Sequence, residues 1–141
     1  MSPAHYLVDT SALGRLFALG IGRFPDWSKA IQNGLVAVSP VTELELLYSA
    51  RSAGHRTRMV EVLNRLFLPS HFDDRHVARA WEIQRELTAR GEHRSAGPVD
   101  LMTAATAELN QLVLLHYDWD FDTITRVTEQ QSQWFAAPVS L

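Results

Sequence analysis

Three short apolar runs, each followed by a segment with helical character, restrict this chain of 141 residues to a fold that alternates strands with helices. The runs are residues 5–8, 35–38 and 112–115, and each has the length and composition of a strand buried on both faces. Such strands pair in parallel, because each intervening helix carries the chain back across the sheet. The sequence therefore predicts one α/β domain over residues 1–141, a three-layer α/β/α arrangement around a central parallel β-sheet.

The remaining elements are expected around these strands. Asp26 is expected to cap a short second helix, and Asp73 or Asp74 a long fifth one. The helices are expected at residues 11–19, 27–33, 40–53, 56–67, 75–90 and from Pro98 onward. Weaker strand candidates are Leu68-Pro69 and, at an edge of the sheet, Trp134-Phe135.

Composition excludes several classes of protein. The chain has no cysteine, which excludes disulfides, thiolate zinc sites and a cysteine nucleophile. No apolar run approaches the roughly 20 residues that span a bilayer, and the first residues lack the basic and apolar regions of a signal peptide, so we expect a cytoplasmic protein without a membrane partner. A net charge of −3 counts against a simple nucleic-acid-binding module. It is compatible with a nuclease, whose metal site needs acidic residues.

A carboxylate marks each of four places where a strand gives way to a helix. These residues are Asp9, Glu45, Asp100 and Asp118. Taken singly, Asp9 is explained by helix capping and Asp100 by the favourable dipole of a first helical turn. Strand ends meet at one edge of a parallel sheet, however, and four carboxylates gathered there would repel one another unless a divalent cation neutralised them. Oxygen ligands suit Mg²⁺ or Mn²⁺ rather than zinc, so the set predicts a metal site for phosphodiester hydrolysis.

Glu43 and Glu45 compete for the second position. In a helix the two side chains point about 160° apart, so one site does not easily use both. Val41, Leu44 and Tyr48 are expected to mark the core-facing side of this helix. Glu45 borders that side and is the better candidate, whereas Glu43 is expected to face outward as a solvated carboxylate.

The acidic cluster after the last strand holds more carboxylates than one helix cap requires. Asp118 is nearest the strand end and is the preferred metal ligand, with Asp120 either a second ligand or a holder of water molecules. Asp122 is then expected to be the cap. His116 is expected to be a buried imidazole satisfied by backbone groups rather than a ligand.

Several segments, in this order, resemble the PIN-domain ribonucleases. They are residues 6–13, 45–50, 93–101, 104–108 and 115–122, and together they span nearly the whole chain. Within that family the chain is most similar to the VapC toxins of type II (VapBC) toxin–antitoxin modules, in particular the actinobacterial branch. The segment His116-Tyr117-Asp118-Trp119-Asp120-Phe121-Asp122 contributes most to this last likeness.

The resemblance implies roles for individual residues. Asp9, Glu45, Asp100 and Asp118 would form the catalytic quartet. The metal ligands would come from Asp9, Asp100, Asp118 and Asp120, with Asp9 and Asp100 the most direct. Many relatives carry threonine, arginine and then asparagine or aspartate where this chain has His116-Tyr117-Asp118, which leaves the shares of Asp118 and Asp120 open.

The resemblance also implies an activity and partners. The expected protein is a Mg²⁺-dependent endoribonuclease toxin that forms a homodimer, is blocked by a cognate VapB-type antitoxin, and cleaves transfer, ribosomal or messenger RNA. Arg94 would contact the RNA, although a solvated loop also explains it. Trp81 and Trp134 could stack on bases, but side chains of this kind are more often core. The alternative function is a PIN-like RNA-binding or regulatory protein that acts within an antitoxin complex with little catalysis.

Overall fold

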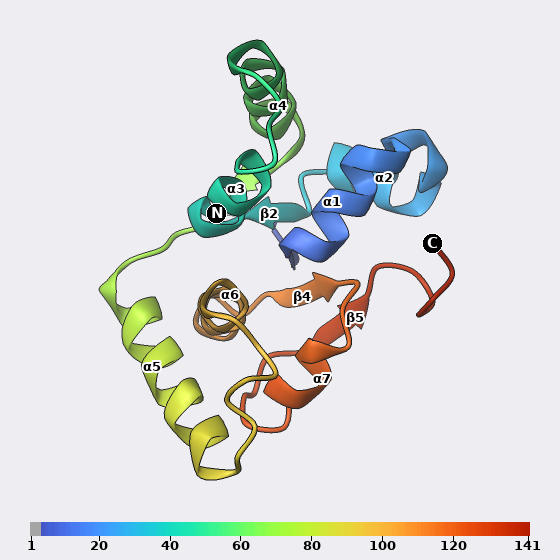
Figure 1. Ribbon diagram of the computed structural model, residues 1–141. Coiled ribbons are helices and arrows are strands. Elements are labelled where there is room, and N and C mark those ends of the chain that lie inside the picture. Colours follow the sequence, from blue (N-terminus) through green and yellow to red (C-terminus); the bar gives the residue numbers. More distant parts are fainter. Residues whose placement is uncertain (1–3) are drawn as a thin grey trace.

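The computed structural model describes residues 4–141 and contains a five-stranded parallel sheet with helices on both faces (Figure 1). The strand order is β3-β2-β1-β4-β5, and every neighbouring pair is parallel. The strands are β1 (Tyr6–Val8), β2 (Val36–Val38), β3 (Leu68–Pro69), β4 (Val113–His116) and β5 (Ser132–Trp134). The expected α/β class is confirmed, and both weaker strand candidates form edge strands.

Seven α-helices and one 3₁₀ helix, η1, connect the strands within this part of the chain. They are α1 (Thr10–Leu19), η1 (Ile21–Arg23), α2 (Pro25–Gln32), α3 (Pro40–Leu47), α4 (Ala53–Leu66), α5 (Asp74–Ala89), α6 (Pro98–Leu109) and α7 (Asp120–Ile124). In residues 4–141 no helix is both long and apolar enough to cross a membrane.

The sheet separates two hydrophobic cores, because successive strand residues point to opposite faces. Leu7 and Leu114 belong to the core beneath α5, α6 and α7, whereas Val8 and Leu115 belong to the core beneath α1 to α4. Figure 1 shows these two groups of helices on opposite sides of the strands. Since all the strands are parallel, their carboxyl ends share one edge of the sheet, and α1, α3 and α7 begin there.

Helix α3 is shorter than expected and buries a different face. It ends at Leu47 instead of continuing to residue 53, because Ser49 Oγ donates to the Leu46 carbonyl at 2.7 Å and Ser52 caps α4 instead. The expected core face was wrong, since Leu44 is 65% exposed and Tyr48 is 93% exposed. The buried residue Thr42 faces Thr103 of α6, with 3.5 Å between their hydroxyl oxygens. Short polar side chains let the two helices approach closely.

Two expected helix caps were also wrong, and one was right. Phe24 precedes α2 with Pro25 as its first residue, so Asp26 lies within the first turn. Trp119 occupies the cap position of α7, which leaves Asp122 in the first turn there as well. Asp73 caps α5, and the His76 side chain completes a reciprocal capping box.

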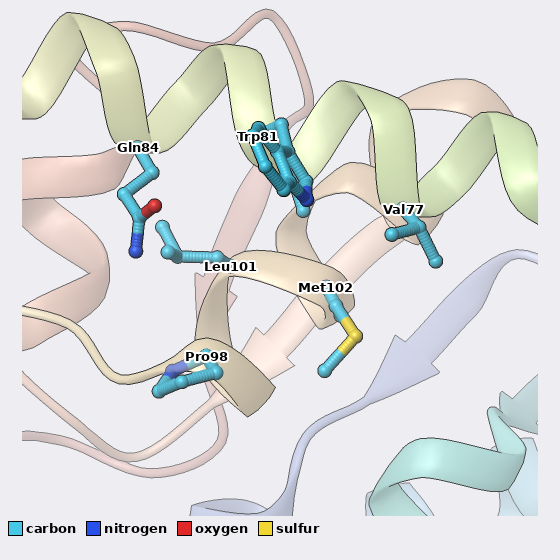
Figure 2. Close-up of a pocket in the computed structure, with 7 residues that line it drawn as sticks. Val77, Trp81, Gln84, Pro98, Leu101 and Met102 are labelled. Atoms are coloured by element: carbon cyan, nitrogen blue, oxygen red, sulfur yellow. The ribbon is translucent and has the colours of Figure 1, made fainter.

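Helices α5 and α6 pack together and leave a small apolar pocket of about 130 Å³ between them (Figure 2). Val77 and Trp81 of α5 face Leu101 and Met102 of α6 across it. Trp81 is 76% exposed at this pocket, so the expectation that it belongs to the core was wrong.

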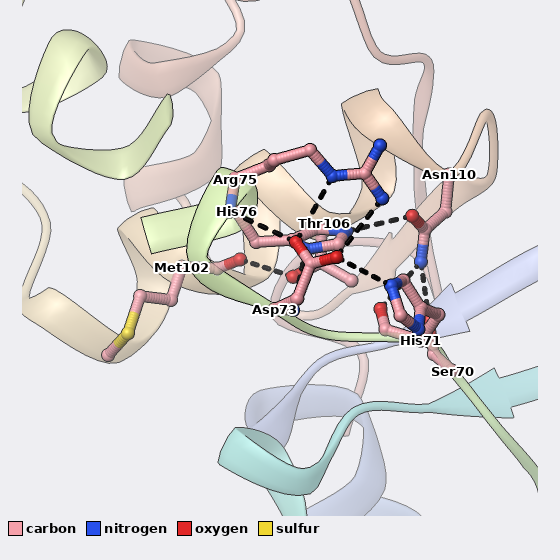
Figure 3. A network of polar contacts seen from close by, with 8 residues as sticks. All are labelled: Ser70, His71, Asp73, Arg75, His76, Met102, Thr106 and Asn110. Carbon is pink, nitrogen blue, oxygen red and sulfur yellow. Dashed lines mark hydrogen bonds and ion pairs between the residues drawn. The ribbon is translucent and has the colours of Figure 1, made fainter. Parts of the chain in front are cut away.

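A polar network ties the start of α5 to the end of α6 (Figure 3). The buried His76 contacts Asn110 Oδ1 through Nε2 at 2.9 Å, and the Asn110 amide donates to Ser70 Oγ at 3.0 Å and to the His71 carbonyl at 2.8 Å. Because the Asp73 backbone N–H donates to His76 Nδ1, a neutral His76 carries its proton on Nε2 and donates it to Asn110.

Replacing Asn110 with alanine is expected to lower the free energy of unfolding by about 2 kcal/mol, because it leaves the buried His76 donor unpaired. Urea unfolding measures this change. Asn64→Ala, at an exposed position of α4, serves as the control and is expected to have little effect. Equal stability of the two variants would show that the network contributes nothing.

Candidate metal centre

Three carboxylates gather at the carboxyl edge of the sheet. One oxygen atom each from Asp100, Asp118 and Asp120 lies within 4.8 Å of the others. Asp100 is in the first turn of α6, Asp118 follows β4, and Asp120 begins α7. The backbone N–H of Asp120 donates to Asp118 Oδ1 at 2.9 Å, which fixes these two residues relative to each other. We call these three residues the carboxylate trio.

The carboxylates of the trio repel one another. Burial raises the pKa of Asp100 to about 6, with further contributions from the charges of Asp118 and then Glu45. The pKa of Asp120 is also raised, by burial and then by the charge of Asp118. Binding of a cation to such a site is favourable, because the cation relieves the repulsion between the carboxylates.

Asp9 lies beside the trio but is bonded differently. It is 2% exposed, and its carboxylate accepts hydrogen bonds from the Ala12 N–H at 3.0 Å and from Ser11 Oγ, which stands 2.8 Å from each of its oxygens. Burial raises the pKa of Asp9 to about 7, and the charge of Asp100 adds a smaller contribution. Asp9 is thus both the cap of α1 and a buried carboxylate close enough to Asp100 for the two to repel.

Ser11 links the ends of two strands, a role that the sequence did not reveal. Its hydroxyl oxygen bonds Asp9 after β1 and accepts from the Tyr117 N–H after β4 at 2.8 Å. The only local signal in the sequence is a serine two residues after Asp9. The contact holds Asp9 against the segment that leads to Asp118.

Removal of this hydroxyl in Ser11→Ala is expected to cost about 1–2 kcal/mol of stability, because the Tyr117 N–H loses its acceptor and Asp9 keeps only the Ala12 N–H as a donor. It is also expected to reduce the RNA cleavage that the family resemblance implies. Chemical denaturation and cleavage rates measure the two effects. Ser28→Ala on α2, a helix without any of these carboxylates, is the matched control. Unchanged cleavage in a folded Ser11→Ala protein would contradict a role for Ser11 in holding Asp9.

The two candidates on α3 differ in surroundings. Glu45 is exposed, and its charge contributes to the raised pKa of Asp100, so it lies near the trio. Glu43 is half-buried, and burial raises its pKa. The expectation that Glu43 would be the more solvated of the two was wrong, but only Glu45 is among the charges that act on Asp100.

His116 and Arg94 complete the inventory of expected residues. His116 is 1% exposed, burial lowers its pKa, and its Nδ1 accepts from the Asp118 N–H at 3.3 Å. The interpretation of a buried imidazole with a backbone partner is therefore confirmed. Arg94 is exposed in the turn that precedes α6 and makes no ion pair with residues 4–141. Its guanidinium is free to bind an anion near the first turn of α6.

Comparison with known proteins agrees with this architecture. The model of the PIN domain family matches residues 6–127. Ribonuclease VapC51 of Mycobacterium tuberculosis (strain ATCC 25618 / H37Rv) is 40% identical over 129 residues, covering 92% of this chain and 91% of the relative. Ribonuclease VapC2 of Mycobacterium tuberculosis (strain CDC 1551 / Oshkosh) is 38% identical over 137 residues, covering 94% of each chain.

The fold is also shared with solved structures of low sequence identity. VapBC2 from Rickettsia felis, solved with a DNA fragment from its promoter, contains a chain with a TM-score of 0.76 and 16% identity, and the match covers 92% of this chain and 97% of that one. VapBC-5 from Mycobacterium tuberculosis matches with a TM-score of 0.58 and 22% identity, covering 94% and 98%. From the family model and the similarity to the curated relatives, this chain belongs to the PIN-domain family and, within it, to the VapC ribonucleases.

Proposed function

We propose that this chain is a metal-dependent endoribonuclease and the toxin of a VapBC-type toxin–antitoxin module. Its residues 1–141 form one PIN domain that cleaves RNA in the cytoplasm and so inhibits translation and growth. The observation that carries the proposal is the carboxylate trio, with Asp9 and Glu45 beside it. The relatives named as VapC ribonucleases support RNA as the substrate.

The residues present fit a hard divalent cation. Every candidate ligand is a carboxylate oxygen, and the mutual repulsion of the carboxylates is the condition that a cation relieves. Asp100, Asp118 and Asp120 would hold Mg²⁺, for which Mn²⁺ is a possible substitute, with Asp9 as the neighbouring carboxylate. When bound, such a cation lowers the pKa of a water molecule and stabilises the charge that develops on the phosphoryl oxygens.

The chain's own residues divide the remaining work. Ser11 and the Ala12 N–H orient Asp9, and the Asp120 N–H orients Asp118. Glu45, the exposed carboxylate near Asp100, accepts the proton of the attacking water. Arg94 binds a phosphate of the RNA from the loop before α6.

The partners follow from family membership. Several of the matching structures are described as VapBC complexes, some of them on DNA, and they support a cognate VapB-type antitoxin for this chain. We also propose a homodimer. An antitoxin arginine placed against the trio would neutralise it in place of the cation and so block the nuclease.

The test is to express the chain from an inducible promoter and to map the 5′ ends of all cellular RNA. A discrete set of new ends, absent with Asp118→Asn, would support endonuclease action and name the substrate. Cleavage by the purified protein should stop on addition of EDTA. New ends that persist in the variant, together with cleavage that resists EDTA, would exclude the proposed function.

A further inference from the structure

The side chain of Trp119 is exposed between two residues of the trio. Of the four tryptophans, Trp27 and Trp134 are half-buried, whereas Trp119 is 61% exposed and Trp81 is 76% exposed. Trp119 is the residue between Asp118 and Asp120, so its backbone shares the turn that brings these two carboxylates together. A large apolar ring left in water, on the residue that joins two of these carboxylates, offers a contact surface on the turn that carries them.

The backbone that carries this ring is fixed on both sides. The Asp120 N–H donates to Asp118 Oδ1 at 2.9 Å across Trp119, and the Asp122 N–H donates to the Trp119 carbonyl at 3.0 Å. The fully buried Phe121 anchors the same turn in the core. The Trp119 side chain therefore projects from a rigid turn and not from a mobile loop.

The ring is also supported from behind. Trp134 of β5 stands 4.9 Å from Trp119, centroid to centroid, with the rings inclined by 67°. Trp134 in turn packs against His116 at 4.8 Å and Tyr117 at 5.8 Å. This arrangement limits the rotamers of Trp119 and lowers the entropy lost when a ligand stacks on it.

We propose that Trp119 stacks on an unpaired RNA base next to the scissile phosphate. The inference rests on the proposed function, since it places the scissile phosphate at the carboxylate trio. A base flanking that phosphate then lies near the turn of residues 118–120, from which the Trp119 side chain projects. A base in a duplex is already stacked on its neighbours, whereas an unpaired base presents its face to an aromatic ring.

Charge sets the conditions under which this contact forms. Asp118 and Asp120 are the sequence neighbours of Trp119 and repel an RNA backbone until a cation neutralises them. Binding should therefore be measured with a divalent ion present. Ca²⁺ takes the same oxygen ligands as Mg²⁺ with longer and more flexible bonds, so it is suited to hold the RNA while cleavage is checked to be absent.

The experiment measures the affinity for a fluorescently labelled, mixed-sequence RNA 12-mer, single-stranded or annealed to its complement, by anisotropy in Ca²⁺. Trp119→Ala is expected to weaken single-strand binding about tenfold, whereas Trp119→Phe keeps most of the affinity. Trp81→Ala is the matched control, because Trp81 is also an exposed tryptophan but lies at an apolar pocket with no carboxylate among its lining residues. Duplex binding should be weaker than single-strand binding and equal in all four proteins.

Other outcomes would overturn the inference. Selective stacking is excluded if Trp119→Ala binds the single strand as tightly as the wild type does. It is also excluded if the substitution weakens single-strand and duplex binding by the same factor. If Trp119→Ala loses self-association in size-exclusion chromatography but keeps its RNA affinity, the ring contacts a second copy of the chain instead of a base. Wild type that neither binds nor cleaves RNA contradicts the proposed function itself, whereas a cleaving enzyme indifferent to Trp119→Ala contradicts only this inference.

Discussion

Asp100→Asn is expected to lower the rate of RNA cleavage by about a thousandfold in Mg²⁺. Asp100 stands in the trio, and its pKa of about 6 reflects burial together with repulsion from Asp118 and Glu45. Asparagine keeps the shape but removes the charge that holds the cation. Single-turnover cleavage of an RNA from the mapped set measures the loss, and circular dichroism checks the fold.

A pair of substitutions on α3 serves as an internal control for that experiment. Glu45→Gln is expected to slow cleavage about a hundredfold, because the charge of Glu45 acts on Asp100. Glu43→Gln, only two residues away, is expected to have little effect, since Glu43 is not among the charges that act on Asp100. If Glu43→Gln were the more harmful substitution, the assignment on α3 would be reversed. A fully active Asp100→Asn enzyme would remove the trio from the mechanism.

The sequence predicts the site well for residues whose position at the end of a strand determines where they lie in the fold. Strand ends in a parallel sheet share an edge, so Asp9 and Asp118 could be expected together from their positions alone. The expectation that Asp100 follows a strand was wrong, because α5 and a turn precede α6, and Asp100 reaches the site from the first turn of α6. The structure places Asp100, Asp118 and Asp120 within one cluster and Asp9 within electrostatic range of Asp100. Glu45, which was preferred to Glu43, is the residue near the trio, but the reason for preferring it was incorrect. The face of α3 that was expected to point to the core is exposed.

The features that sequence reasoning missed depend on contacts between distant segments. Thr42 is buried because Thr103 of α6 faces it, and no periodicity within residues 40–47 indicates that neighbour. Ser11 and Tyr117 are 106 positions apart, and their hydrogen bond follows only from the pairing of β1 with β4. The sequence shows which residues are acidic, whereas the tertiary structure determines which carboxylates are fixed by hydrogen bonds and which groups donate those bonds.

The balance between stability and function at Asp9 leads to the second large prediction. Asp9→Asn is expected to stabilise the metal-free protein by about 3 kcal/mol more at pH 8 than at pH 5, while it abolishes cleavage. Burial raises the pKa of Asp9 from 3.8 to about 7, so between these values the folded protein keeps a proton that the unfolded chain releases. The contribution of Asp9 to stability therefore falls as the pH rises through this range.

Urea unfolding in EDTA at pH 5, 6, 7 and 8 measures the difference, with the exposed Asp26→Asn as control. The variant must be compared with wild type at each pH, because His116 acts in the opposite direction. Burial lowers the pKa of His116 below 6.5, so its contribution is lost as the pH falls. At pH 8, a divalent cation at a hundred times its dissociation constant should raise the free energy of unfolding of the wild type by about 3 kcal/mol. The same concentration should stabilise Asp9→Asn much less. Parallel pH profiles for the two proteins would mean that ionisation of Asp9 does not destabilise the folded protein.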